Sequence, residues 1–206
     1  HACLTEFALR CRVNAVTAIA EYVETVRRQQ RAARHTVSLV LAVHAVALLG
    51  LTIAQARVEW RYGLWFVLVP AVTYLLLWLI VRIRQSLTGM GGGHDGFGIM
   101  AAVALAVAMA FPFSLVAILF AGAGTFLGIG LVVIGARMGA RALWGPGVAL
   151  AVLCPFVALG TFENHAAILG HQTGTLVLGV LSACLALLSG RSYLAERAAL
   201  GVPAHP

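Results

Sequence analysis

An uncharged stretch in the middle of the chain is the feature that most constrains its fold. From Gly98 to Ala136 the sequence runs for 39 residues without an Asp, Glu, Lys or Arg. A helix needs roughly 20 mostly apolar residues to cross the hydrocarbon core of a bilayer, which is about 30 Å thick. This stretch is too long for one such helix and long enough for two, which we expect to be joined by a tight turn near residues 121–125.

Four other apolar segments have a length suited to membrane-spanning helices, namely residues 36–56, 63–81, 146–162 and 173–190. The whole chain is 61% hydrophobic and only 10% charged. Soluble domains are instead about half apolar and about a quarter charged. The sequence therefore predicts an all-α, polytopic membrane protein with six transmembrane helices within residues 36–190.

The arginines predict the orientation of these helices. All 14 basic residues are Arg, and the chain contains no Lys. Basic residues near the ends of spans are retained on the cytoplasmic side. With six spans and a cytoplasmic N-terminus, twelve of the fourteen arginines fall inside and only Arg57 and Arg61 fall outside. We expect a multi-pass protein of the cell (plasma) membrane, such as a bacterial inner membrane, with both termini cytoplasmic. The basic charge then orients loops, and we expect no nucleic-acid partner.

The two ends of the chain differ from the apolar middle. Within residues 1–35, apolar side chains recur every three to four positions at Val16, Ile19, Val23 and Val26. This spacing predicts an amphipathic cytoplasmic or interfacial helix before the first span. Its arginines would meet the anionic headgroups of the lipid bilayer. The alternative is a docking face for a cytoplasmic protein partner or for a homo-oligomer. Residues 191–206 are expected to form a cytoplasmic C-terminal tail.

Several chemistries are excluded by residues that the sequence lacks. Without Lys there is no retinal Schiff base or other lysine-imine chemistry. No Asp or Glu lies in a predicted span, so a paired-aspartate intramembrane protease is excluded. The cysteines show no metal-ligand spacing and are interpreted as small apolar fillers; they are Cys3, Cys11, Cys154 and Cys184. We therefore predict no metal, no cofactor and no catalytic residue.

Prolines within the spans indicate a ligand cavity. Three of them fall near the middle of three different spans, where each removes a backbone hydrogen bond and can kink its helix. Kinked helices around a shared space near the midplane are typical of transporters. His44 also lies well inside a span, where it either binds a ligand or is a core histidine bonded to a neighbouring helix. The predicted ligand-binding residues are His44, Pro70, Tyr74, Pro112, Ser114 and Pro155.

A polar cluster lies between the fifth and sixth spans, on the predicted outer side. It contains Glu163, His165 and His171. Residues six apart on a helix project about 240° from each other, so the two histidines share a metal only if the chain turns between them. Their spacing matches no compact zinc signature. We interpret the segment as a polar outer connection rather than a metal or acid–base site.

Three functional hypotheses follow from these patterns. The favoured one is a small transport component, or a substrate-binding membrane subunit, for an apolar or weakly polar solute. The second is a membrane sensor, regulatory or assembly protein that docks a cytoplasmic partner through its N-terminal helix. The third is a membrane-embedded enzyme that acts on lipid at the outer face through the Glu163, His165 and His171 cluster.

Overall fold

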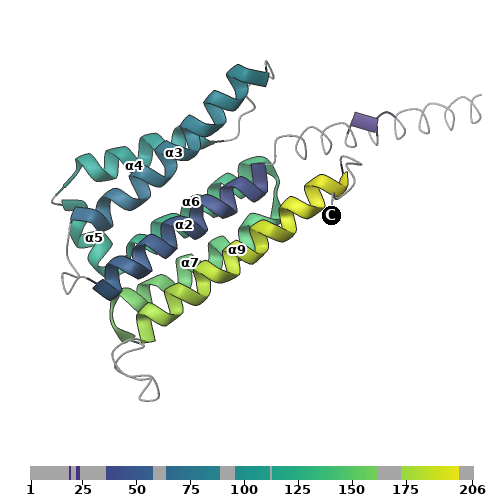
Figure 1. Ribbon diagram of the computed structural model, residues 1–206. Helices are drawn as coiled ribbons and strands as arrows, with labels where there is room; N and C mark the ends of the chain where they lie inside the picture. The colour runs from purple at the N-terminus through teal and green to yellow at the C-terminus, as the bar shows by residue number, and fades with distance from the viewer. Residues whose placement is uncertain are drawn as a thin grey trace, which may run out of the picture. The chain divides into compact units, whose positions relative to one another are not determined.

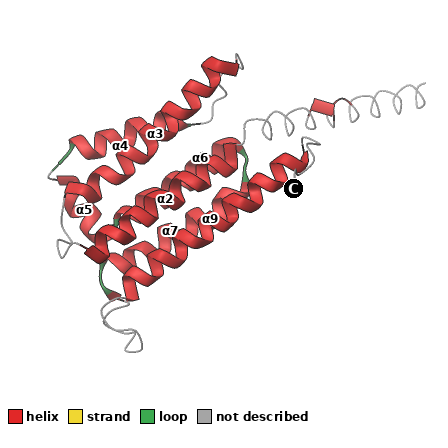
Figure 2. Ribbon diagram, in the orientation of Figure 1, coloured by secondary structure: helices red, strands yellow, loops and turns green. Residues whose placement is uncertain are grey.

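The structure is a computed structural model that describes residues 19, 22–23, 36–57, 64–88, 96–111, 113–161 and 173–199. Every regular element in these residues is a helix, and they contain no strand (Figure 2). The chain divides into two compact units, Val37–Gly190 and the two terminal segments His1–Thr36 with Arg191–Pro206. Except for residues 19, 22 and 23, the amphipathic helix expected in residues 1–35 lies outside the described residues.

The described residues form seven helices. In chain order they are α2 (Thr36–Arg57), α3 (Leu64–Thr88), α4 (Phe97–Met109), α5 (Phe113–Ala121), α6 (Ala123–Met138), α7 (Arg141–Ala158) and α9 (Thr173–Ala199).

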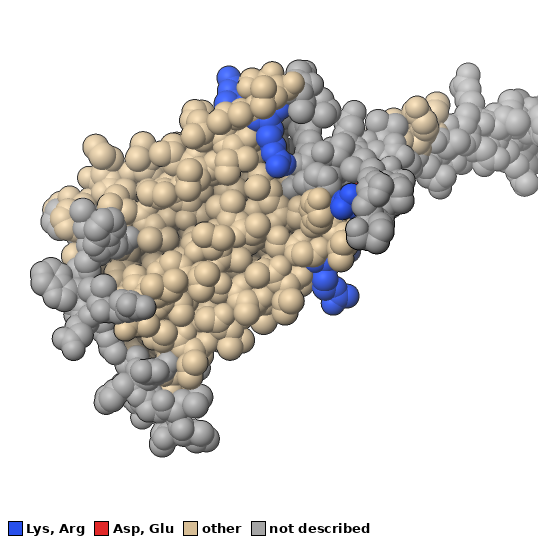
Figure 3. Space-filling model, viewed as in Figure 1, with Lys and Arg blue, Asp and Glu red and all other residues tan. Residues whose placement is uncertain are grey.

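Four of these helices are long and apolar enough to cross a membrane: α2, α3, α7 and α9. The bent pair α4 and α5 would make a fifth if it is one broken span, whereas α6 is apolar but shorter. Large apolar side chains are exposed along these helices, and most of the face in Figure 3 carries no charge. A surface of this kind is compatible with an integral membrane protein, in which lipid rather than water would cover it.

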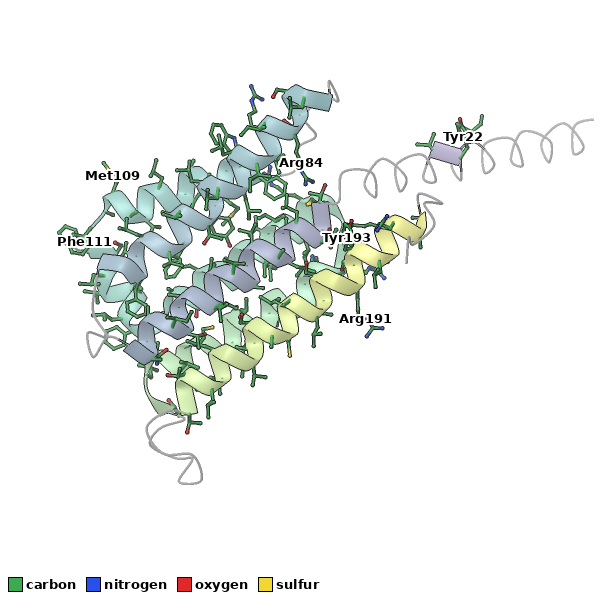
Figure 4. The ribbon with its side chains drawn as sticks, in the orientation of Figure 1. Tyr22, Arg84, Met109, Phe111, Arg191 and Tyr193 are labelled. Carbon is green, nitrogen blue, oxygen red and sulfur yellow. The ribbon has the colours of Figure 1, made fainter. Side chains whose placement is uncertain are left out.

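The long uncharged stretch differs from its expected form. It contains three helices rather than two, and α4 and α5 meet at an angle of 112°. Met109 and Phe111 lie exposed at this bend (Figure 4). Pro112 follows these residues in the sequence. A proline disfavours the helical conformation of the residue before it, which explains why α4 ends here. A second break, at Gly122, falls where a turn is expected; Gly122 has φ 79°, which glycine adopts without a steric penalty.

Three other helices extend several residues beyond their expected limits at one end. The expected span 63–81 is observed as α3, which continues to Thr88. The expected span 146–162 is observed as α7, which begins five residues earlier at Arg141, and the expected span 173–190 is observed as α9, which continues to Ala199. An apolar run marks only the part of a helix that suits lipid, whereas the backbone hydrogen bonds of a helix also form in polar sequence. The helices therefore extend past the hydrophobic segments that reveal them.

Helices α6 and α7 approach each other closely within the Val37–Gly190 unit. A Cβ atom added to Gly128 would lie 2.5 Å from the backbone nitrogen of Ala151 and 2.6 Å from the carbonyl oxygen of Gly147. One added to Gly147 would lie 2.8 Å from Cγ2 of Val132. The two helices approach this closely only because both positions lack side chains.

Helix α2 provides the centre of the core. Val40, Leu41, His44 and Leu48 have no exposed surface. The helix lies beside α6 and α9 (Figure 1). The hydroxyl of Ser182 on α9 donates to the carbonyl oxygen of Ala45 at 2.8 Å. Such hydrogen bonds between helices contribute about 0.6 kcal/mol on average in a membrane.

Candidate solute site

A buried histidine and a buried tyrosine link three helices. Nδ1 of His44 donates to the carbonyl oxygen of Val40 at 2.8 Å, one turn earlier on α2. Its Nε2 lies 3.3 Å from the hydroxyl oxygen of Tyr74 on α3, and the two rings meet edge to face. The Tyr74 hydroxyl donates to the carbonyl oxygen of Leu127 on α6 at 2.9 Å. Two residues of the predicted ligand-binding set therefore contact each other and hold the core together.

A separate apolar cavity of about 80 Å³ lies where six helices meet. We call it the Cys154 cavity. The described residues that line it come from α2, α3, α5, α6, α7 and α9 and from the glycine between α5 and α6. They are Leu51, Gln55, Phe66, Leu115, Ile118, Leu119, Gly122, Ala123, Gly124, Cys154, Val157, Ala158 and Leu178.

The short helix α5 forms one wall of the Cys154 cavity. Leu115, Ile118 and Leu119 contribute the wall, and Gly122 follows at the break into α6. A Cβ atom on Gly122 would lie 3.0 Å from the carbonyl oxygen of Cys154, so the break packs directly on α7. The cavity is thus bounded by a helix that is interrupted at both of its ends.

The polar groups of this cavity are few. Among the described residues that line it, only Gln55 has a strongly polar side chain, and only Cys154 adds a thiol. The Gln55 amide makes no hydrogen bond to another described residue. Cys154 is a buried, free cysteine. None of these lining residues is an Asp, Glu, Lys, Arg or His, so the described wall offers no full charge to a ligand.

None of the predicted ligand-binding residues is among those that line the Cys154 cavity. Pro70 and Tyr74 instead line a second, smaller cavity of about 30 Å³ together with residues of α4, α5 and α6. Pro155 is half-buried on α7, beside Cys154 in sequence, and Pro112 lies outside the described residues. Ser114 is buried at the start of α5, and its hydroxyl has no hydrogen-bond partner in the described part of the chain. A ligand-binding role for these residues stays a prediction.

The outer polar cluster lies outside the described residues, since Glu163, His165 and His171 all fall between the end of the 113–161 segment and the start of α9. Within the described ranges, no group of three or more His, Cys, Asp or Glu residues is arranged to hold a metal ion.

Two residues that line the cavity, Gln55 and Cys154, were not among the ligand-binding residues predicted from the sequence. Gln55 lies two residues before the end of α2 at Arg57, and because amides are common at the ends of spans it had no distinct signal in the sequence. Cys154 had no local signal, because a lone cysteine in an apolar run has the same appearance whether it packs in a core or lines a cavity.

The fold and the site together define a class rather than an individual protein. Several apolar helices suggest a multi-pass membrane protein, and described residues of six of these helices line a small apolar cavity. Comparison of the chain with protein-family models, with curated proteins and with solved structures finds no match.

Proposed function

We propose that this chain is a six-span membrane protein that acts as a small transport component, or as a substrate-binding membrane subunit, and that it receives an apolar or weakly polar solute in the Cys154 cavity. The observation that carries the proposal is that an interrupted helix, α5, lines an apolar cavity at the meeting point of six helices. Interrupted helices that border a cavity are a recurrent feature of transporters.

The six crossings would be α2, α3, α4, α6, α7 and α9. At 1.5 Å per residue, the 16 residues of α6 extend about 24 Å, which is somewhat short of a typical hydrocarbon core of about 30 Å. A cytoplasmic position of both termini is supported by the arginines at helix ends. A Cβ atom on Gly96, at the start of α4, would lie 2.7 Å from Cδ of Arg137 near the end of α6. These two ends therefore lie on the same side, as the arginine distribution requires.

The size of the cavity limits the solute. An apolar cavity of roughly 150 Å³ in another protein holds benzene, which has six heavy atoms. The Cys154 cavity has about 80 Å³, roughly half of that volume. By the same proportion it has room for a body of about three or four heavy atoms.

Native mass spectrometry of the protein purified in mild detergent tests this binding. Ala123 is buried in the wall of the cavity, so Ala123→Leu fills it. Ala117→Leu is the matched control, because Ala117 lies exposed on α5 and does not line the cavity. We expect a small solute bound to the wild type and to the control and absent from the filled variant. Retention of the same solute by Ala123→Leu, or its absence from the wild type, would contradict the proposal.

Transport also requires that the cavity open to water. Cys154 reports this event, because it is buried and becomes reactive only when its surroundings open. In membrane vesicles we expect a charged, membrane-impermeant thiol reagent to label Cys154 slowly from one face of the membrane. The substitution Ala123→Leu should lower this labelling rate further. A Cys154 that stays unlabelled until the protein unfolds would indicate a static bundle.

The other two hypotheses depend on the N-terminal segment 1–35 and on the outer cluster Glu163, His165 and His171. Both lie almost wholly outside the described residues, and no described residue favours either function.

A further inference from the structure

From the residues that line the Cys154 cavity we infer that its solute is uncharged and carries a hydrogen-bonding group, which the Gln55 amide recognises. This inference rests on the proposed function, because it names the chemical class that the same cavity accepts. It assigns Gln55 as the residue that determines specificity.

The first step concerns charge. The described lining is made of aliphatic, aromatic and glycine residues apart from the amide and the thiol. A charged solute would leave water without meeting an opposite charge among these residues, and an unpaired charge is strongly disfavoured in an apolar environment. The lining therefore selects against carboxylates and ammonium ions.

The second step concerns polarity. Gln55 lies half-buried on α2 among apolar residues, and its amide bonds to no other described residue. An amide has two N–H donors and a carbonyl acceptor, so it can pair with an alcohol, a ketone or another amide. Ligand pockets of this kind combine an apolar wall with a few polar groups that fix the orientation of the ligand. A small alcohol can pair with this amide, whereas a purely apolar solute cannot.

The experiment measures how solutes protect Cys154 from methyl methanethiosulfonate, a small uncharged thiol reagent. The protein carries Cys3→Ser and Cys11→Ser, which leaves Cys154 in the cavity and the exposed Cys184 as an internal reference. Three solutes with the same carbon chain are compared at equal concentration: 1-propanol, propanoate and propylammonium. Xenon serves as the apolar probe without a hydrogen-bonding group. Protection is measured as a decrease in the labelling rate of Cys154 relative to that of Cys184.

We expect 1-propanol to protect Cys154 and the two ions to leave its labelling rate unchanged. In Gln55→Leu the concentration of 1-propanol that halves labelling should rise about ten-fold or more, because the buried hydroxyl loses its partner. Protection by xenon should persist in this variant. Gln85→Leu is the matched control, since Gln85 lies on α3 and does not line the cavity; it should behave as the parent protein.

Each contrary outcome has a distinct meaning. Equal protection by propanoate or propylammonium would overturn the selection against charge. An unchanged response of Gln55→Leu to 1-propanol would overturn the role of Gln55, provided that Ala123→Leu still abolishes protection. If Ala123→Leu leaves all protection intact, the solutes do not act in this cavity and the proposed function itself fails.

Discussion

The hydroxyl of Tyr74 donates a hydrogen bond to the carbonyl oxygen of Leu127 while Nε2 of His44 lies 3.3 Å from the same hydroxyl oxygen. A tyrosine hydroxyl has a single hydrogen. Because Nδ1 of His44 donates to Val40, a neutral imidazole leaves Nε2 as an acceptor that also seeks that hydrogen. The shorter contact, to Leu127 on α6, takes this hydrogen, and the longer contact to His44 brings α2 to the same hydroxyl, so Tyr74 is the polar residue at which the three helices meet.

Replacement of Tyr74 tests this role. Tyr74→Phe removes the hydroxyl and keeps the ring, so we expect the free energy of unfolding to fall by about 0.6 to 2 kcal/mol, the range for hydrogen bonds between membrane helices. Tyr22→Phe is the control, because Tyr22 is exposed. Thermal unfolding in detergent measures both, and a Tyr74→Phe variant as stable as the wild type would show that the hydroxyl contributes nothing.

Gly130 provides the space that Tyr74 occupies. A Cβ atom at this position would overlap the hydroxyl and the ring of Tyr74. We expect Gly130→Ala to lower the free energy of unfolding by about 1 to 3 kcal/mol through overpacking. The loss should shrink when Tyr74 is replaced by alanine in the same chain, since neighbouring substitutions do not add. Additive effects in this double-mutant cycle would rule out the contact.

Gly128 should be equally intolerant of a side chain, for a different reason. Here the added Cβ atom meets the backbone of α7 at Ala151 and Gly147, which cannot rotate away. We expect Gly128→Ala to lower the unfolding temperature and Gly145→Ala, where nothing lies within 4 Å, to leave it unchanged or raise it. If Gly128→Ala unfolds at the same temperature as the Gly145→Ala control, this close approach of α6 and α7 would be contradicted.

The proposed topology predicts which loops face the outside. In a chain without native cysteines, Ile168→Cys should react with an impermeant thiol reagent added outside intact cells. Gly92→Cys should react only after the membrane is permeabilised, because the arginines place its loop in the cytoplasm. Position 168 reacting solely from the cytoplasmic side would reverse the orientation.

The outer cluster is expected to bind no metal. We predict that His165→Ala combined with His171→Ala leaves folding and metal content unchanged, because two ligands about 240° apart on a helix and one carboxylate do not complete a structural zinc site. Elemental analysis of the purified proteins decides the matter. About one zinc per chain in the wild type, lost in the double variant, would instead support an enzyme at this face.

Much of the fold was readable from the sequence. The helices α2, α3, α7 and α9 each overlap one of the apolar runs, because a segment in lipid would have to satisfy its backbone hydrogen bonds internally. The break at Gly122 was expected near its observed place. The bend at the end of α4 was not, since a proline marks where a helix can end without giving the angle at which the next one continues.

The sequence by itself determined the helical class and the apolar surface, both of which depend on the composition of each segment alone. Tertiary structure decided which residues meet. His44 and Tyr74 are 30 positions apart, and Tyr74 and Leu127 are 53 apart, so no local pattern pairs them. Gln55 and Cys154 likewise share a cavity only because six helices pack around it. In an apolar chain most faces of a helix resemble one another, and the partners are selected by shape: by glycines that let helices approach and by breaks that leave a space between them.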